Sequence, residues 1–193
     1  MTVAPKPFDR ATLEEAFERL GEKAVAAQKV IEISVYGGSA LVLTTGYRIS
    51  TQDVDAVFEK DRTFVNRAAE QIAVEFGWSA DWLNDGVKGF LSKRDDEPDA
   101  KTLFRSYPSE AQSGLRVFVA SPSYLFAMKC LAMRIGGAGQ NEDVQDIRQL
   151  GGILGIASAA DAFAIVSRYY PSGRLPPKTQ FGIEEIFGGA SKT

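Results

Sequence analysis

Apolar residues recur along this chain with two periods, and the change of period separates predicted helices from predicted strands. Apolar positions spaced three or four residues apart predict amphipathic helices. These helices cover residues 8–29, 64–76, 124–135, 142–150 and 159–169. Short runs rich in β-branched residues predict strands. These strands cover residues 31–35, 53–58, 102–105 and 115–119. Strands are therefore expected only before residue 120, and helices alone after it.

Glycine, proline and serine mark where the predicted elements begin and end. Gly46 is expected to end a short helix that starts at Ala40, and Gly77 to end the helix over 64–76. Ser121 and the proline after it open the helix over 124–135. The remaining segments carry no regular pattern. They are an aromatic and polar segment at 78–92, a charged loop at 93–98, a flexible glycine-rich break at 136–139, a proline-rich connection at 171–177 and a last short turn at 184–187.

A double-glycine turn separates the strand over 31–35 from the helix that starts at Ala40. Gly37 and Gly38 allow unusual backbone angles and a close approach by a ligand. Ser39 is expected to cap the helix. Backbone N–H groups and the helix dipole at such a start attract anions. The turn therefore predicts a phosphate site at Gly38 and Ser39, although a tight turn without a ligand would use the same residues.

Two carboxylates follow on the next strand. Asp53 and Asp55 alternate with Val54, so both are expected on one face while Val54 points into the core. Like charges held this close disfavour ionisation of each other. A bound Mg²⁺ or Mn²⁺ removes that penalty and takes its other ligands from phosphates and water. The simpler alternative is an exposed strand with acidic outer positions. The glycine turn upstream favours the metal site, and together they predict phosphoryl or nucleotidyl transfer.

Composition narrows the chemistry. The chain has 193 residues, 45% of them hydrophobic and 24% charged, with a net charge of -3 that gives no general affinity for nucleic acid. It has no histidine, which excludes histidine-based nucleophile pairs, general bases and zinc sites. The single cysteine, Cys130, lies in an apolar helix and is expected to be a buried thiol. We expect a cytoplasmic protein with no membrane segment.

These residues resemble the signature of the polymerase-β-type nucleotidyltransferase superfamily, in which a glycine-serine turn precedes Asp-x-Asp on a strand. Within it, the chain is similar to the AbiEii-like toxin nucleotidyltransferases and closest to the DUF6036 group. Three stretches carry the likeness. They are residues 36–55, residues 82–87 and residues 124–134. The resemblance implies an α/β (α+β) nucleotidyltransferase fold with a small mixed sheet flanked by helices. Residues 1–120 would form this core, and residues 121–193 a helical part that closes the active-site cleft.

The resemblance also implies roles and partners. Lys129 would bind the nucleotide triphosphate, and Asp143 would support the site, with Asp146 as the alternative. The reaction would move a nucleoside monophosphate from an NTP to an acceptor hydroxyl. The acceptor would be RNA such as a tRNA 3′ end, and the protein would be a toxin paired with an antitoxin protein. The alternatives are transfer to a protein or a small molecule, or a non-catalytic nucleotide-binding module.

Several residues allow a second interpretation. Arg48 either clamps phosphate or pairs with Asp53. Lys129 could instead extend from an apolar helix to water, and Asp143 could lie on an ordinary solvated face. Trp78 and Trp82, with Asn84 and Asp85, could stack a base and hydrogen-bond its edge, but packing of the aromatics against the sheet is preferred. The superfamily often has a third carboxylate on the strand that corresponds to 115–119, and this chain has none there. One-metal chemistry therefore stays open beside two-metal chemistry.

Overall fold

The computed structural model describes residues 7–134 and 140–191. It has a mixed five-stranded sheet with helices around it and a helical C-terminal part, which is an α+β fold. The backbone separates into two compact units. The first contains residues 1–89 and 101–120, and the second contains residues 90–100 and 121–193.

The sheet of the first unit has the strand order β3-β2-β1-β5-β4. Strand β1 (Ile31–Val35) lies in the middle. It pairs in parallel with β5 (Ser113–Ala120) and antiparallel with β2 (Val54–Val57). The edges are β4 (Lys101–Pro108), antiparallel to β5, and the two-residue β3 (Leu83–Asn84), parallel to β2. Both strand directions are therefore present, as a mixed sheet requires.

One face of this sheet is buried and the other is partly exposed. Alternate residues of a strand point to opposite faces. On the buried face of β1 lie Ile31, Ile33 and Val35, each at most 1% exposed. Their neighbours on β2 and β5 are buried as well. The opposite face of β1 carries Glu32, which is exposed, and Ser34, which is partly exposed. Polar side chains of the sheet thus have a face with access to solvent.

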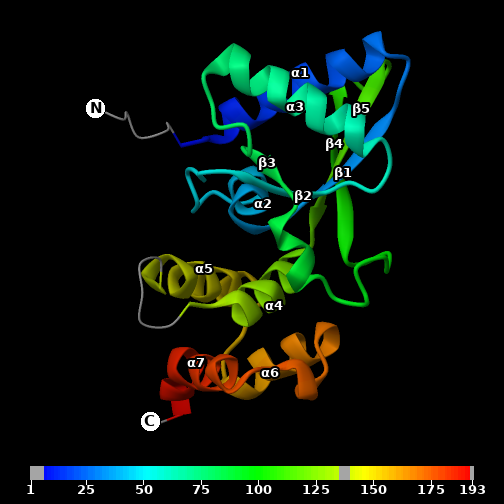
Figure 1. Cartoon of the computed structure of the whole chain (residues 1–193). Coiled ribbons are helices and arrows are strands. Elements are labelled where there is room, and N and C mark those ends of the chain that lie inside the picture. The colour runs from blue at the N-terminus through cyan, green and yellow to red at the C-terminus, as the bar shows by residue number, and fades with distance from the viewer. Residues whose placement is uncertain (1–6, 135–139, 192–193) are drawn as a thin grey trace. The chain divides into compact units, whose positions relative to one another are not determined.

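Helices of the first unit enclose the apolar core. Helix α1 (Arg10–Ala26) packs against β4, β5 and α3 (Arg62–Phe76), and α1 and α3 run side by side in Figure 1. Two glycines allow the close approach of α1 to the sheet. A β-carbon on Gly114 would lie 2.2 Å from the Gly21 carbonyl oxygen, and one on Gly21 would lie 2.6 Å from the Tyr107 carbonyl oxygen. Backbone therefore meets backbone at this contact.

The second unit contains four α-helices among its described residues. They are α4 (Pro122–Ala132), α5 (Gln140–Ile153), α6 (Ala159–Tyr169) and α7 (Pro177–Phe187). Helix α4 packs against the other three. Within the described residues, no helix combines the length and the apolar character that crossing a membrane requires.

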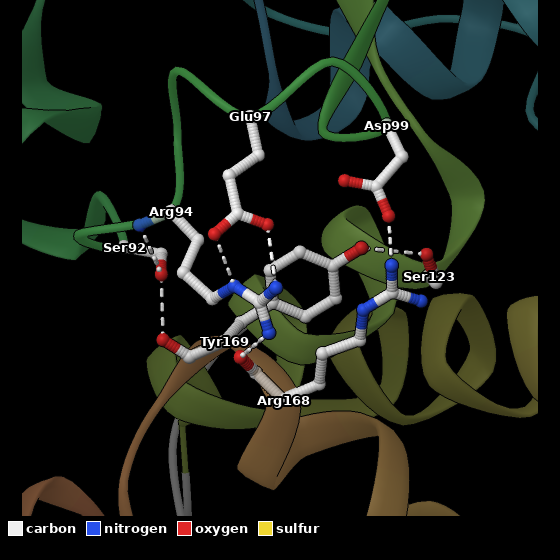
Figure 2. Close-up of polar contacts among 7 residues, drawn as sticks. All are labelled: Ser92, Arg94, Glu97, Asp99, Ser123, Arg168 and Tyr169. Carbon is white, nitrogen blue, oxygen red and sulfur yellow. Dashed lines mark hydrogen bonds and ion pairs between the residues drawn. The ribbon is translucent and has the colours of Figure 1, made fainter.

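The segment Phe90–Ala100 belongs to the second unit. Its side chains form hydrogen bonds and ion pairs with residues at the end of α6 (Figure 2). Ser92 Oγ donates to the Tyr169 carbonyl oxygen at 2.5 Å. The Arg94 guanidinium donates to both carboxylate oxygens of Glu97, from Nε at 2.7 Å and from Nη2 at 2.6 Å. It also donates to the Arg168 carbonyl oxygen. Arg168 in turn pairs with Asp99. This charged loop lies in the sequence between two segments of the first unit, but its contacts make it part of the helical unit.

The structure changes several element boundaries. Helix α2 (Gly37–Thr44) begins three residues before Ala40, with Tyr36 at the N-cap, so the expected cap at Ser39 is wrong. Strand β3 and a 3₁₀ turn over Gly86–Phe90 lie in the segment that carried no predicted element. The predicted last short turn at 184–187 is the end of a longer helix, α7, which begins at Pro177, a first-turn position where the missing N–H of proline costs nothing. The predicted break at 136–139 lies outside the described residues.

The division into units also differs from the predicted boundary. The prediction assigned all of residues 1–120 to the core, whereas residues 90–100 group with the helices. The contacts that hold this segment join residues about 70 to 80 positions apart. A single boundary in the sequence cannot describe two units when a segment within the first one packs with the second.

Candidate functional site

The turn after β1 is the first component of the candidate site. Strand β1 ends at Val35, Tyr36 is extended, and Gly37 takes a positive φ of 58°. That conformation costs a residue with a β-carbon about 1–2 kcal/mol and glycine very little. Helix α2 starts at once, and the first N–H groups of a helix have no acceptor inside it. The N-terminal end of α2 therefore presents donors and the positive end of a dipole.

Asp55 lies directly beside this turn. The Tyr36 N–H donates to the Asp55 carbonyl oxygen at 2.9 Å, which continues the pairing of β1 with β2. A β-carbon on Gly37 would lie 2.5 Å from Asp55 Oδ2, a distance that real β-carbons do not tolerate. The Asp55 carboxylate thus occupies space that any other residue at position 37 would fill.

Asp53 and Asp55 alternate with buried neighbours. Val54 and Ala56 are fully buried, whereas Asp53 and Asp55 are both partly exposed. Strand β2 begins at Val54, so Asp53 lies one residue before the strand that was predicted to contain it. Asp55 is fixed to β1 through its backbone, and Asp53 is not part of that ladder. Both carboxylates are therefore partly accessible to solvent, but their backbones are held in different ways.

Asn84 joins the pair from the neighbouring strand. The parallel register of β2 and β3 places Asn84 opposite Asp55. Its Nδ2 donates to Asp53 Oδ2 at 3.1 Å, and its Oδ1 accepts from the Gly86 N–H at 2.9 Å. The sequence indicated Asn84 only as a group that could hydrogen-bond a base edge, and its contact with Asp53 was not predicted. Nothing in the sequence indicates that a two-residue strand pairs there.

Arg48 and Thr51 approach the turn at Gly38. A β-carbon on Gly38 would lie 2.7 Å from Thr51 Oγ1 and 3.2 Å from the Arg48 Cζ and Nη2 atoms. Thr51 is 5% exposed, and its backbone exchanges two hydrogen bonds with Phe8. Arg48 Nε donates to the Ser50 carbonyl oxygen at 3.2 Å. A cation and a hydroxyl thus lie next to the N-terminal turn of α2, with Arg48 among the residues predicted there.

Ser39 is arranged differently from the expectation. Its hydroxyl donates to the Tyr36 carbonyl oxygen at 2.9 Å, and the residue is 1% exposed. The hydroxyl points back into the first turn of α2 because Ser39 is its third residue. Its backbone N–H, as a first-turn donor, is the group that the helix start presents.

Lys129 and Asp143 lie together in the second unit. The Lys129 Nζ is 2.8 Å from Asp146 and 3.5 Å from Asp143, so α4 and α5 are joined by ion pairs. Asp143 and Asp146 are 6% and 4% exposed. Arg134 also holds Asp143, with its Nε 2.8 Å from Oδ2. Lys129 thus binds both aspartates that were considered as alternatives.

The charge balance of this cluster sets the ionisation of Asp143. Burial disfavours its charged form, but hydrogen bonds from Arg134 and the charge of Lys129 outweigh burial. The pKa of Asp143 therefore lies below its ordinary value. Cys130, next to Lys129, is fully buried, and burial raises the pKa of its thiol, which makes it a structural residue.

The oxygen donors of the first unit fit a hard divalent cation. Asp55 on β2 and Asp53, just before that strand, both supply partly exposed carboxylate oxygens, and such ligands suit Mg²⁺ or Mn²⁺. Across residues 7–134 and 140–191, no group of three or more His, Cys, Asp or Glu side chains that could hold a metal ion is found.

Trp78 and Trp82 take the packing role that was preferred for them. Trp82 is 2% exposed, and its indole N–H donates to the Ala69 carbonyl oxygen on α3 at 2.9 Å. Trp78 contacts Trp82, Phe8 and Phe76 through its ring. These aromatics connect β3, α3 and the N-terminal segment.

Comparisons of the chain with protein-family models, with curated proteins and with solved structures give no match. Any function must therefore be argued from the residues of this chain.

Proposed function

We propose that this chain is a metal-dependent nucleotidyltransferase that moves a nucleoside monophosphate from an NTP to an acceptor hydroxyl. The observation that carries the proposal is the contact between Asp55 and Gly37, because it joins the acidic pair to an anion-attracting helix start. A nucleoside triphosphate needs both environments, since its phosphates are anions that bind together with a divalent cation.

Asp53 and Asp55 would hold Mg²⁺ or Mn²⁺, and the bound cation would neutralise negative charge on the phosphates. The N–H groups at Gly38 and Ser39 would bind phosphate oxygens, with the Arg48 guanidinium beside them. The acceptor oxygen forms a bond to the α-phosphorus, and the bond from that phosphorus to the bridging oxygen breaks. Pyrophosphate leaves, and the acceptor proton passes to a carboxylate or to water, since the chain has no histidine.

The identity of the acceptor is a more specific part of the proposal. By resemblance it is RNA, such as a tRNA 3′ end, in the cytoplasm, with a cognate antitoxin as protein partner. The assignment of Lys129 to the triphosphate and of Asp143 to its support also rests on resemblance. The ion pairs of Lys129 with Asp143 and Asp146 give it a structural role within the second unit as well.

The test is a transfer assay with each of the four labelled NTPs and Mg²⁺ or Mn²⁺, using total RNA or purified proteins as acceptors. Label on RNA supports the proposal in full, and label on protein supports transfer to the alternative acceptor. Bound nucleotide without any transfer would instead indicate a non-catalytic binding module.

The matched variants are Asp55→Ala and Glu32→Ala. Both remove a carboxylate from the same side of the sheet, but Glu32 pairs with Arg116 at 3.2 Å, a partner on β5. We expect Asp55→Ala to lower transfer by about 100-fold or more, as for the loss of one electrostatic group at a reaction centre. Glu32→Ala should transfer at the wild-type rate. Undiminished transfer by Asp55→Ala, with circular dichroism showing a folded protein, would refute the assigned site.

A further inference from the structure

The two carboxylates of the candidate site differ in what holds them. Asp55 belongs to β2, and its carbonyl oxygen accepts from the Tyr36 N–H at 2.9 Å, so the backbone sets where its side chain begins. Asp53 precedes β2, where the ladder to β1 has ended. A cation shared by both residues needs the Asp53 carboxylate to be fixed by other means, since ordering a mobile ligand costs entropy.

Asn84 provides that fixation. Its side chain has one acceptor and two donors. The acceptor, Oδ1, takes the Gly86 N–H at 2.9 Å, which closes a turn of the type that Asn forms with the backbone two residues on. The opposite end of the amide, Nδ2, must then face Asp53 Oδ2, at 3.1 Å. The Gly86 contact thus sets the direction of the amide, and a donor rather than an acceptor meets the carboxylate.

The backbone of Asn84 is itself anchored. The Val54 N–H donates to the Trp82 carbonyl oxygen at 2.6 Å, which begins the pairing of β2 with β3. The buried Trp82 indole is tied to Ala69 on α3. Asn84 therefore connects a rigid part of the core to the carboxylate of Asp53, a residue outside the backbone pairing of β1 with β2.

Building on the proposed function, we infer that Asn84 is a positioning residue for the metal site. Its Nδ2–H donates to Asp53 Oδ2 and leaves Asp53 Oδ1 for the cation. Partners of this kind orient a metal ligand, and their removal lowers metal affinity roughly 10–100-fold. Asn84 does not contact the reacting atoms in this assignment, so its effect passes through Asp53.

The experiment measures Mn²⁺ binding to the full chain by electron paramagnetic resonance, without nucleotide. Thermal unfolding without metal reports separately on the fold. We expect Asp53→Ala to abolish specific Mn²⁺ binding and Asn84→Ala to weaken it roughly 10–100-fold. Asn66→Ala, which changes an exposed asparagine on α3, should bind as the wild type does. Asn84→Ser keeps a side-chain oxygen in the turn, and we expect it to bind more weakly than the wild type.

The outcomes separate this inference from the proposed function. Wild-type affinity in Asn84→Ala overturns the positioning role while the site itself stands, provided that Asp53→Ala has lost binding. If Asn84→Ala does not fold, Asn84→Ser decides, and wild-type affinity there overturns the role in the same way. If Asp53→Ala binds Mn²⁺ as the wild type does, the metal site fails and the inference fails with it.

Discussion

The contact between Gly37 and Asp55 predicts that a single methyl group will affect the site far more than the fold. Gly37→Ala places a β-carbon at φ 58°, where a residue with a side chain loses about 1–2 kcal/mol of folding free energy. It also places that carbon 2.5 Å from Asp55 Oδ2. The carboxylate is the end of a side chain that can rotate, so relief of the clash displaces Asp55 rather than unfolding the protein.

Gly77→Ala is the matched control. Gly77 has a φ of 69°, and a β-carbon there meets nothing within 4 Å. It carries the same backbone penalty without a clash. We expect both variants to unfold at lower temperature than the wild type, by roughly 2–8 °C, since 1 kcal/mol corresponds to about 2–4 °C at this chain length.

The assay compares thermal unfolding by circular dichroism with Mn²⁺ binding by electron paramagnetic resonance. Gly37→Ala should lose Mn²⁺ affinity, and Gly77→Ala should keep it. Wild-type Mn²⁺ affinity in Gly37→Ala would show that Mn²⁺ binding does not depend on the position of the Asp55 carboxylate beside the turn. The link between the glycine turn and the acidic pair would then be refuted.

Three further predictions concern the rest of the fold. Gly114→Ala should destabilise the protein by about 1–3 kcal/mol in chemical unfolding, because its β-carbon would lie 2.2 Å from backbone of α1; Gly46→Ala, with open space around it, should remain near the wild type. Lys129→Met should cost about 3–5 kcal/mol, because it removes the Lys129 ammonium from its ion pair with the buried Asp146, and adding Asp146→Asn should recover part of that loss; equal stability of the single and double variants would contradict this. The lowered pKa of Asp143 means that its stabilisation is complete above the ordinary value of 3.8 and is lost as pH falls through the lower folded value, so Asp143→Asn should flatten the pH dependence of unfolding below about pH 4.

The predicted strand over 31–35 matches β1, and the predicted helix over 159–169 matches α6, because each pattern is strong and local. The alternation around Asp53 and Asp55 likewise predicted that Val54 points into the core, and Val54 is fully buried between two partly exposed acids. Gly77 ends α3 with a positive φ, as its place after an amphipathic stretch predicts.

Other features depend on contacts between segments distant in sequence. Strand β3 is two residues long, and only its pairing with β2 and the burial of Trp82 define it. The roles of Asn84 and Thr51 follow from such contacts, as does the attachment of residues 90–100 to α6.

The sequence by itself therefore determined the elements with a strong local pattern, such as β1 and α6, and the burial of Val54 between two partly exposed acids. These properties depend on neighbours a few positions away, where the spacing of side chains reports the geometry directly. Tertiary structure alone decided that Asp55 lies against Gly37, that Asn84 holds Asp53, and that Lys129 pairs with Asp146. Each of these contacts joins side chains whose separation along the chain says nothing about their distance in space, until strand pairing and helix packing bring them together.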